Sequence, residues 1–117
     1  MTTATSIRPD DLPGTIRTYL AAHTASDVEE ALAAFTTTAV VVDDGSTYRG
    51  TDDIRRFLSK AGAEFTFTTE LIGAQRVDDA HWVATHRLEG DFPGGVVELR
   101  YRFALAGDLI AELVIAP

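Results

Sequence analysis

The sequence predicts an α+β fold in which N-terminal helices pack on a strongly curved, mostly antiparallel sheet that encloses a pocket. Apolar residues recur at helical spacing in the first half of the chain, between Leu12 and Ala61. From Glu64 onward they alternate with polar residues at the period of two that strands require. Strands with one apolar face need cover on one side, and the preceding helices can supply it. The 117 residues suit a single domain, 1–117, with residues 1–10 as a flexible N-terminal tail.

Two helices are expected before the first strand. The first follows Pro13, which suits an initial helical turn, and residues recur along it at helical spacing: Leu12, Ile16, Tyr19 or Leu20, and His23. The second begins at "SDVE", where Ser26 and Glu29 match a capping box. Both helices therefore present an apolar face that a sheet can bury.

A short hairpin and a third helix come next. "AVVVDDGSTYRG" is typical of a strand, a turn at Gly45 and a short return strand. The third helix is expected from Thr51 as its N-cap, with acidic residues in its first turn. Its buried face is expected to consist of Ile54, Phe57, Leu58 and Ala61.

The second half of the chain reads as long antiparallel strands separated by turn signals. Apolar and polar residues alternate in "EFTFTTELIG", and a strand through "GAQRV" follows it. Further strands are expected at "HWVATHRLEG", "VVELRYRFALAG" and "LIAELVIA". The connections "DDA", "DFPGG" and "AGD" carry the residues that turns favour. This order predicts a meander.

The composition excludes several classes of function. The formal net charge of −8 argues against nucleic acid or an anionic membrane as a partner, because both attract basic surfaces. The absence of cysteine excludes disulfides and thiolate metal sites, and the three histidines lack metal-ligand spacing. No phosphate-loop motif, secretory signal or membrane-spanning run is present. We expect a cytoplasmic protein without a metal or cofactor.

The order of helix, helix, short hairpin, helix and long antiparallel strands resembles the NTF2-like superfamily. Its members have a cone-shaped α+β fold and include ketosteroid-isomerase-like and SnoaL-like polyketide cyclase proteins. "YLAAHTASDVEEALAAFTTTAVVVDDG" and "YRGTDDIRRFL" look like the family's opening, and "LRYRFALAGDLIAELVI" looks like its closing hairpin. The resemblance covers roughly Leu12 to Ala116. It implies the fold more specifically than the activity, because this superfold hosts isomerases, cyclases, hydrolases, dehydratases and non-catalytic binders.

The resemblance also implies roles for three positions. Ketosteroid isomerases have an aspartate base at the end of the strand after the second helix, and Asp43 matches it. Their oxyanion-donating tyrosine in the first helix matches Tyr19. Their protonated aspartic acid on the penultimate long strand corresponds to Leu99, which cannot donate a hydrogen bond. Losing one oxyanion donor costs about 3 kcal/mol of transition-state stabilisation, which argues against steroid isomerisation itself.

Asp43 is the strongest candidate for a catalytic residue. If apolar side chains cover it, desolvation raises its pKa and makes it a better base near neutral pH. The alternative is a hairpin aspartate that binds backbone N–H groups around Gly45. Strand alternation points Asp44 the other way, so we expect Asp44 to be a turn residue. Tyr19 either donates to a substrate oxygen or is a helix-core tyrosine with its hydroxyl at the rim.

Two polar residues stand out on otherwise apolar stripes of the last strands. His86 either relays a proton or is a buried histidine with a satisfied ring. Glu112 either faces the pocket, with Ile110 and Val114, or lies at an edge facing solvent. If Asp43, His86 and Glu112 converge, they form a general acid–base set. His23 and His81 are expected at the surface.

The pocket itself is expected to be mainly apolar, as ligand sites usually are. The substrate-binding side chains that we expect are Phe35, Phe57, Trp82, Leu88, Leu99, Tyr101, Phe103 and Val114. Arg100 and Arg102 lie on the opposite, outer face of the sheet. The resemblance implies a homodimer through that outer face.

Together these features favour an enzyme that acts on a small hydrophobic carbonyl compound by cofactor-independent acid–base catalysis, as an isomerase or a polyketide-cyclase-like protein. One alternative is a non-catalytic protein that binds a hydrophobic small molecule. A limonene-type epoxide hydrolase is less favoured, because the pocket Asp–Arg–Asp arrangement of that class would need an inward arginine, and Arg100 and Arg102 are expected to face outward.

Overall fold

The structure is a computed structural model that describes residues 4–60 and 67–117. The helices among these residues are α1 (Gly14–Thr24), α2 (Val28–Ala33) and α3 (Gly50–Lys60), with a 3-10 helix η1 (Pro9–Asp11). The strands are β1 (Thr5–Ile7), β2 (Phe35–Asp43), β3 (Ser46–Arg49), β4 (Phe67–Arg76), β5 (His81–Gly90), β6 (Val96–Ala106) and β7 (Leu109–Ala116). The expected α+β class is confirmed.

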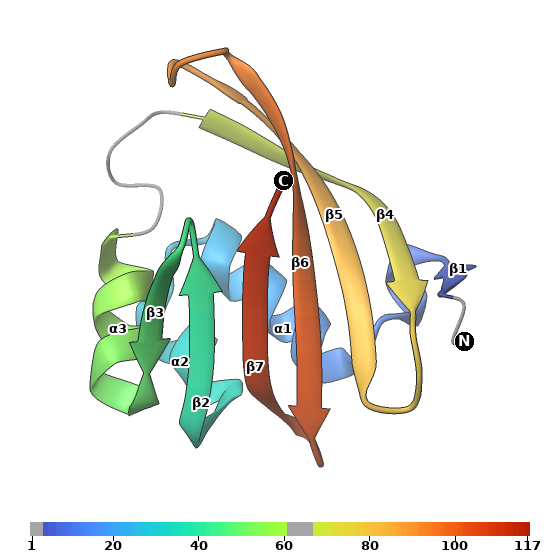
Figure 1. Cartoon of the computed structure of the whole chain (residues 1–117), viewed down its shortest axis with the longest axis vertical. Helices are drawn as coiled ribbons and strands as arrows, with labels where there is room; N and C mark the ends of the chain where they lie inside the picture. Colours follow the sequence, from blue (N-terminus) through green and yellow to red (C-terminus); the bar gives the residue numbers. More distant parts are fainter. Residues whose placement is uncertain (1–3, 61–66) are drawn as a thin grey trace.

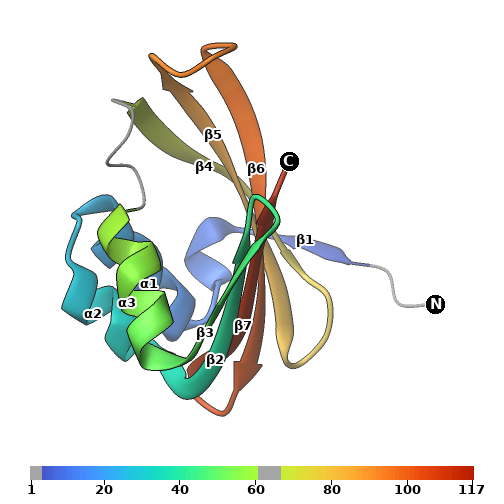
Figure 2. The ribbon, with the colours of Figure 1, turned by 60° about the vertical axis from the view of Figure 1, so that its left-hand side comes forward.

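The described strands form one mixed sheet in the order β1-β4-β5-β6-β7-β2-β3, and the sheet is not closed into a barrel. All neighbours pair antiparallel except β2 and β7, which are parallel. Figure 1 shows α1 and α2 behind the lower half of the sheet and α3 beside β3 at its edge. Figure 2 shows β4, β5 and β6 bending above the helices, so the upper part of the sheet extends beyond its helical cover.

The core lies between α1, α3 and the lower half of the sheet. Tyr19 of α1 is fully buried, with its ring 5.3 Å from that of Phe35 and 5.9 Å from that of Phe103, measured between ring centroids. The expected apolar face of α3 is buried through Ile54, Phe57 and Leu58. No helix among the described residues is long and apolar enough to span a bilayer.

The N-terminal segment differs from the expected flexible tail over residues 1–10. Thr5–Ile7 form β1, which pairs antiparallel with β4 in the register Thr5↔Arg76 and Ile7↔Ala74. A short edge strand is stabilised by backbone hydrogen bonds to its neighbour, which no side-chain pattern in three residues reveals.

The helix starts also differ from the expected ones. The cap of α2 is Asp27, whose carboxylate accepts from the backbone N–H of Glu30 at 3.2 Å, whereas Ser26 adopts a positive φ of 57° in the preceding turn. Helix α3 begins at Gly50, before Thr51. Ala61 and the start of the strand expected from Glu64 lie outside the described residues.

A bulge in β7 changes which side chains face the helices. Glu112 pairs with Ala104 while Ile110 pairs with Leu105, so Ala111 is an extra residue in β7. An extra residue shifts the alternation by one, so buried Ile110 is followed by buried Leu113 rather than by Glu112. The expectation that Glu112 faces the pocket is therefore wrong, and Glu112 is exposed.

Candidate functional site

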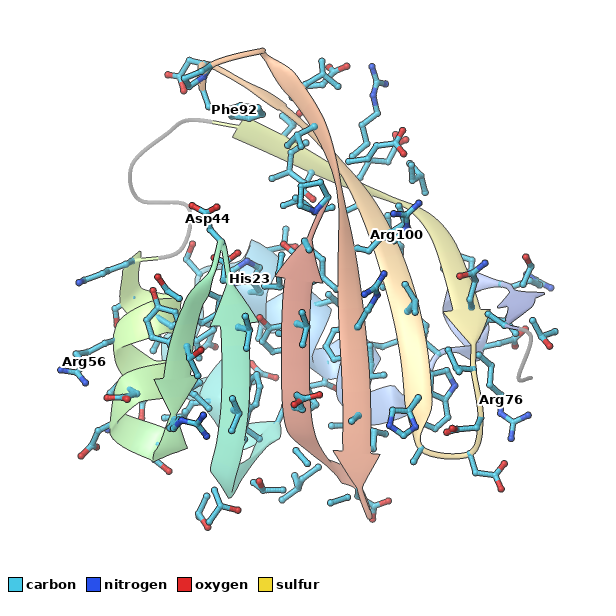
Figure 3. All side chains as sticks on the ribbon, viewed as in Figure 1. His23, Asp44, Arg56, Arg76, Phe92 and Arg100 are labelled. Carbon is cyan, nitrogen blue, oxygen red and sulfur yellow. The ribbon has the colours of Figure 1, made fainter. Side chains whose placement is uncertain are left out.

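An open cleft of about 1120 Å³ lies where the sheet extends beyond the helices. Its walls come from the β2–β3 hairpin, the ends of α1 and α3, the β5–β6 hairpin and the end of β7. In Figure 3, Asp44 and His23 lie near the upper end of β2, and Phe92 lies on the β5–β6 hairpin above them. The apolar part of the lining consists mainly of Phe57, Leu88, Val97, Leu99, Val114 and Ile115.

Asp43 enters this cleft because of the turn that follows it. Asp44 and Gly45 both have positive φ, 51° and 77°, and connect β2 to β3 as a two-residue hairpin turn. Asp44 is thus the turn residue that the sequence predicts. Asp43 pairs with Ile115 and lies on the same face as buried Val41, so its carboxylate points to the concave side.

The environment of Asp43 favours its protonated form. Its side chain is half-buried, and burial raises the pKa of the carboxyl above its ordinary value, with a further increase from the charge of Asp44. Among the residues that the structure describes, no hydrogen bond or ion pair offsets this effect. A carboxylate without such partners is a stronger base than an exposed one.

Tyr101 lies at the same level as Asp43 on the same face. Tyr101 and Asp43 both pair with Ile115, from β6 and β2 on either side of β7. Two strand spacings separate their backbones by about 10 Å, and the side chain of Ile115 lies between them on the same face, so a ligand that contacts both groups would lie over Ile115. Burial, and then the charge of Asp43, raise the pKa of Tyr101 to about 12. Tyr101 therefore stays protonated and can donate a hydrogen bond into the cleft.

Tyr19 occupies a different place from the one that its expected role requires. It is fully buried and does not line the cleft. Its hydroxyl has no hydrogen-bond partner within the described residues. Burial raises its pKa far above the usual range, with smaller effects from Tyr101 and Asp43. Its hydroxyl thus lies near the inner end of the cleft but behind the lining.

His86 is also buried behind the cleft lining rather than in it. It is 6% exposed, and its Nδ1 has no hydrogen-bond partner in the described part of the chain. Its ring centroid lies 4.6 Å from that of Tyr101. Burial, followed by the effect of His23, lowers its pKa to about 4, so the ring is neutral near pH 7. With Glu112 outside, the expected convergence of Asp43, His86 and Glu112 does not occur.

The expected substrate-binding residues separate into two groups. Those that line the cleft are Phe57, Leu88, Leu99, Tyr101 and Val114. Phe35 and Phe103 are buried core residues, and Trp82 is a half-buried residue packed against that core. Whether one of these side chains lies in the core or lines the cleft depends on its position along the strand. The helices cover the side chains level with them and leave uncovered those beyond them.

Sequence reasoning missed His23 as a cleft residue. It was expected at the surface, but it is half-buried in the last turn of α1 and lines the cleft. Burial lowers the pKa of its imidazole. The helical spacing already indicates this position, because His23 follows Tyr19 by one helical turn on the buried stripe of α1.

The described residues contain no group of three or more potential side-chain ligands that could hold a metal ion. Arg100 and Arg102 are exposed on the outer sheet face, as expected. The cleft is therefore a mainly apolar site whose acid–base groups are Asp43, Tyr101 and His23, with Asp44 and Lys60 at its edge.

Comparisons with known proteins agree with this architecture. The family profile described as the SnoaL-like domain matches residues 16–113. A provisionally assigned polyketide cyclase from Sinorhizobium meliloti has a similar structure, with a TM-score of 0.86 and 28% identity over 94% of this chain and 100% of that one. No curated protein sequence matches significantly.

Two more distant structures share the fold. One is a protein from Catenulispora acidiphila with a ketosteroid isomerase-like fold, in complex with trimethylamine, with 18% identity, a TM-score of 0.76 and coverage of 90% of this chain and 85% of that one. The other is a computationally designed binder of 17-OHP, with 17% identity, a TM-score of 0.71 and 88% coverage of each chain.

Proposed function

The chain belongs to the SnoaL-like domain family, and we propose that its cleft binds a small, mainly apolar carbonyl compound from which Asp43 removes a proton. Membership confirms the family that the sequence resembles. The observation that carries the proposal is a half-buried carboxylate without a polar partner among the described residues, in a cleft lined mainly by hydrocarbon. Keeping such a carboxylate charged is unfavourable, so taking up a proton lowers its free energy more than it does for an exposed carboxylate.

Two side chains supply the chemistry. Asp43 takes a proton from a carbon next to the carbonyl group, and the C–H electron pair moves onto the carbonyl oxygen to form an enolate. The hydroxyl of Tyr101 donates a hydrogen bond to that oxygen from the same level of the sheet. A positioned base contributes about 10²–10⁴-fold in rate, and one oxyanion donor contributes about 10²–10³-fold.

The reaction class that fits is an isomerisation or an intramolecular ring closure through an enolate. The relative from Sinorhizobium meliloti, provisionally described as a polyketide cyclase, supports the second. Neither reaction needs a cofactor, because the proton taken from carbon is returned within the same reaction. Limonene-type epoxide hydrolysis is not favoured, since no arginine is among the described residues that line the cleft.

Deuterium exchange tests the role of Asp43. A panel of steroid, terpenoid and polyketide-like ketones is incubated with the protein in D₂O, and exchange next to the carbonyl is followed by NMR. We expect exchange with at least one ketone, reduced about 10²-fold or more in Asp43→Asn and less in Tyr101→Phe. His81→Gln is the matched control, because His81 is exposed and bonded to Asp78 instead of lining the cleft.

A non-catalytic binder is the second candidate function. Leu99 lines the cleft with hydrocarbon where a second oxyanion donor would stand, and the designed 17-OHP binder has the same fold. Thermal shift with the same ketones separates the two candidates. Stabilisation by a ketone without exchange, equal in wild type and Asp43→Asn, would establish a binder and contradict the role given to Asp43.

A further inference from the structure

His23 lines two hollows of the molecule. Besides the main cleft, a small hollow of about 10 Å³ opens beside the α1–α2 turn, lined by Ser26, Asp27 and Leu58 among others. A space of this size holds about one water molecule. Among the described residues, His23 lines both this hollow and the cleft. It is the one described residue that the two linings share.

The imidazole is suited to moving a proton between the two hollows. Burial lowers its pKa, so the ring is neutral near pH 7 and has one nitrogen that accepts and one that donates. Its plane stacks on the ring of Tyr19 at a centroid distance of 5.8 Å and an angle of 8°, which holds the orientation of the ring. An imidazole that lines both hollows can accept a proton at one ring nitrogen and release one from the other.

Asp43 alone has no evident way to exchange its proton once a ligand fills the cleft. The carboxyl is half-buried without a ligand, and an apolar ligand would cover it further. A proton taken from carbon would then stay with the ligand and Asp43 and would not exchange with solvent. A second group with its own access to solvent changes this outcome, because it can deliver a different proton.

We propose that His23 is a second proton-transfer residue of the cleft, which exchanges protons with solvent through the small hollow beside the α1–α2 turn. The inference rests on the proposed function of Asp43. The proton that Asp43 takes from carbon passes by way of the ligand oxygen to the accepting nitrogen of His23. The resulting imidazolium releases a proton to water in the small hollow, and a solvent proton returns by the reverse route to the enolate carbon. Asp43 ends ionised and His23 neutral, with no net consumption of protons.

The first test measures exchange with 2-tetralone in D₂O as a defined probe. We expect His23→Ala and His23→Gln to bind the ketone, by thermal shift, but to exchange its protons at least tenfold more slowly than wild type. Added imidazole should restore exchange in His23→Ala, since it can occupy the vacated space, and should not change the rate of His81→Ala. A merely structural role for His23 predicts no such rescue. Wild-type exchange rates in both His23 variants, or failure of imidazole to restore the rate, would overturn the inference.

The second test needs no catalytic activity. Diethyl pyrocarbonate modifies accessible neutral imidazoles, and the modified residues can be identified by mass spectrometry. We expect modification of His23 and His81 but not of buried His86. An unmodified His23 would overturn the inference whatever the exchange rates are.

The two proposals fail in distinguishable ways. Loss of exchange in Asp43→Asn with wild-type rates in His23→Ala keeps the base and removes the inference about His23. The opposite result is an exchange rate equal to wild type in Asp43→Asn, together with a lost rate in His23→Ala that imidazole restores. That result removes the role of Asp43 and retains His23 as a proton-transfer residue.

Discussion

The closed lower half and the open upper half of the cone are built from the same strand faces. On β6, Phe103 is 1% exposed and packs on Tyr19, whereas Tyr101, two residues along the same face, lines the cleft. On β2, Val41 is fully buried and Asp43, again two residues along, is half-buried in the cleft. The candidate chemistry therefore begins where α1 and α3 stop covering the sheet.

Burial has different consequences in the two halves. Burial holds Tyr19, in the closed half, and His86, which pairs with Leu99 beyond the boundary, uncharged, and neither side chain lines the cleft. At the boundary it perturbs the pKa values of Asp43, Tyr101 and His23, while all three remain in the cleft lining. A perturbed group is a functional candidate only where a ligand can reach it, so the boundary is the part of the molecule to test.

The largest expected effect contrasts the two halves of β6 directly. Phe103→Ala should destabilise the fold by about 3–5 kcal/mol, because it leaves a cavity in the closed core. Leu99→Ala, at the cleft, should cost about 1 kcal/mol or less, because that side chain is half-exposed. Urea unfolding of both variants measures the difference. Equal losses would mean that the cleft is packed like the core.

His86 should make the stability of the fold sensitive to acid. Its folded pKa of about 4 lies below the unfolded value of 6.5, so folding favours the neutral ring. Its contribution to stability is complete above pH 6.5 and is lost as the pH falls toward 4, by up to about 3 kcal/mol. Unfolding of wild type and His86→Leu between pH 7.5 and pH 4 should show a smaller loss in the variant. Parallel curves would mean that His86 reaches a proton acceptor that stabilises its charged form.

Tyr19→Phe should stabilise the protein. The hydroxyl of Tyr19 has no hydrogen-bond partner in the described residues, and removing an unsatisfied buried donor recovers its desolvation cost, about 1 kcal/mol. Thermal unfolding should show a higher Tm, while Tyr48→Phe, at a half-buried site in the cleft lining, should change the Tm less. A lower Tm for Tyr19→Phe would show that its hydroxyl is bonded in the folded protein.

The smallest expected effect belongs to Asp43, which is only half-buried. Because its folded pKa is raised above the unfolded value, the native state holds the proton more tightly. Stability should therefore fall as the pH rises through the unfolded pKa, and Asp43→Asn should be slightly more stable than wild type near pH 7. The difference should disappear below about pH 4, near the ordinary pKa of aspartate. A less stable Asp43→Asn at pH 7 would indicate an unrecognised partner for the carboxylate.

Several expectations stay predictions. The homodimer through the outer sheet face, the hydrophobic ligand and the cytoplasmic location are not tested by the structure of one chain. The exposure of Arg100 and Arg102 is compatible with such an interface and does not establish it.

Local sequence determined most of the fold and the place of Asp43. Helical periodicity, the two-residue turn at Asp44 and Gly45, and strand alternation all act within a few residues, so their physical causes can be read from neighbouring letters. The tertiary structure decided the rest. The extra residue Ala111 turned Glu112 outward, because a bulge depends on the partner strand as well as on the sequence of its own strand.

The same distinction explains which aromatic and polar residues reach the cleft. Alternation correctly put Tyr101 and Phe103 on one face, but only the position of α1 over the sheet covered Phe103 and Tyr19 and left Tyr101 at the boundary. The packing of α1 on the sheet also places His23, which we expect at the surface from the sequence, in the lining of the cleft. Which face a side chain takes is a local property of the strand or helix, whereas what covers that face depends on how distant elements pack.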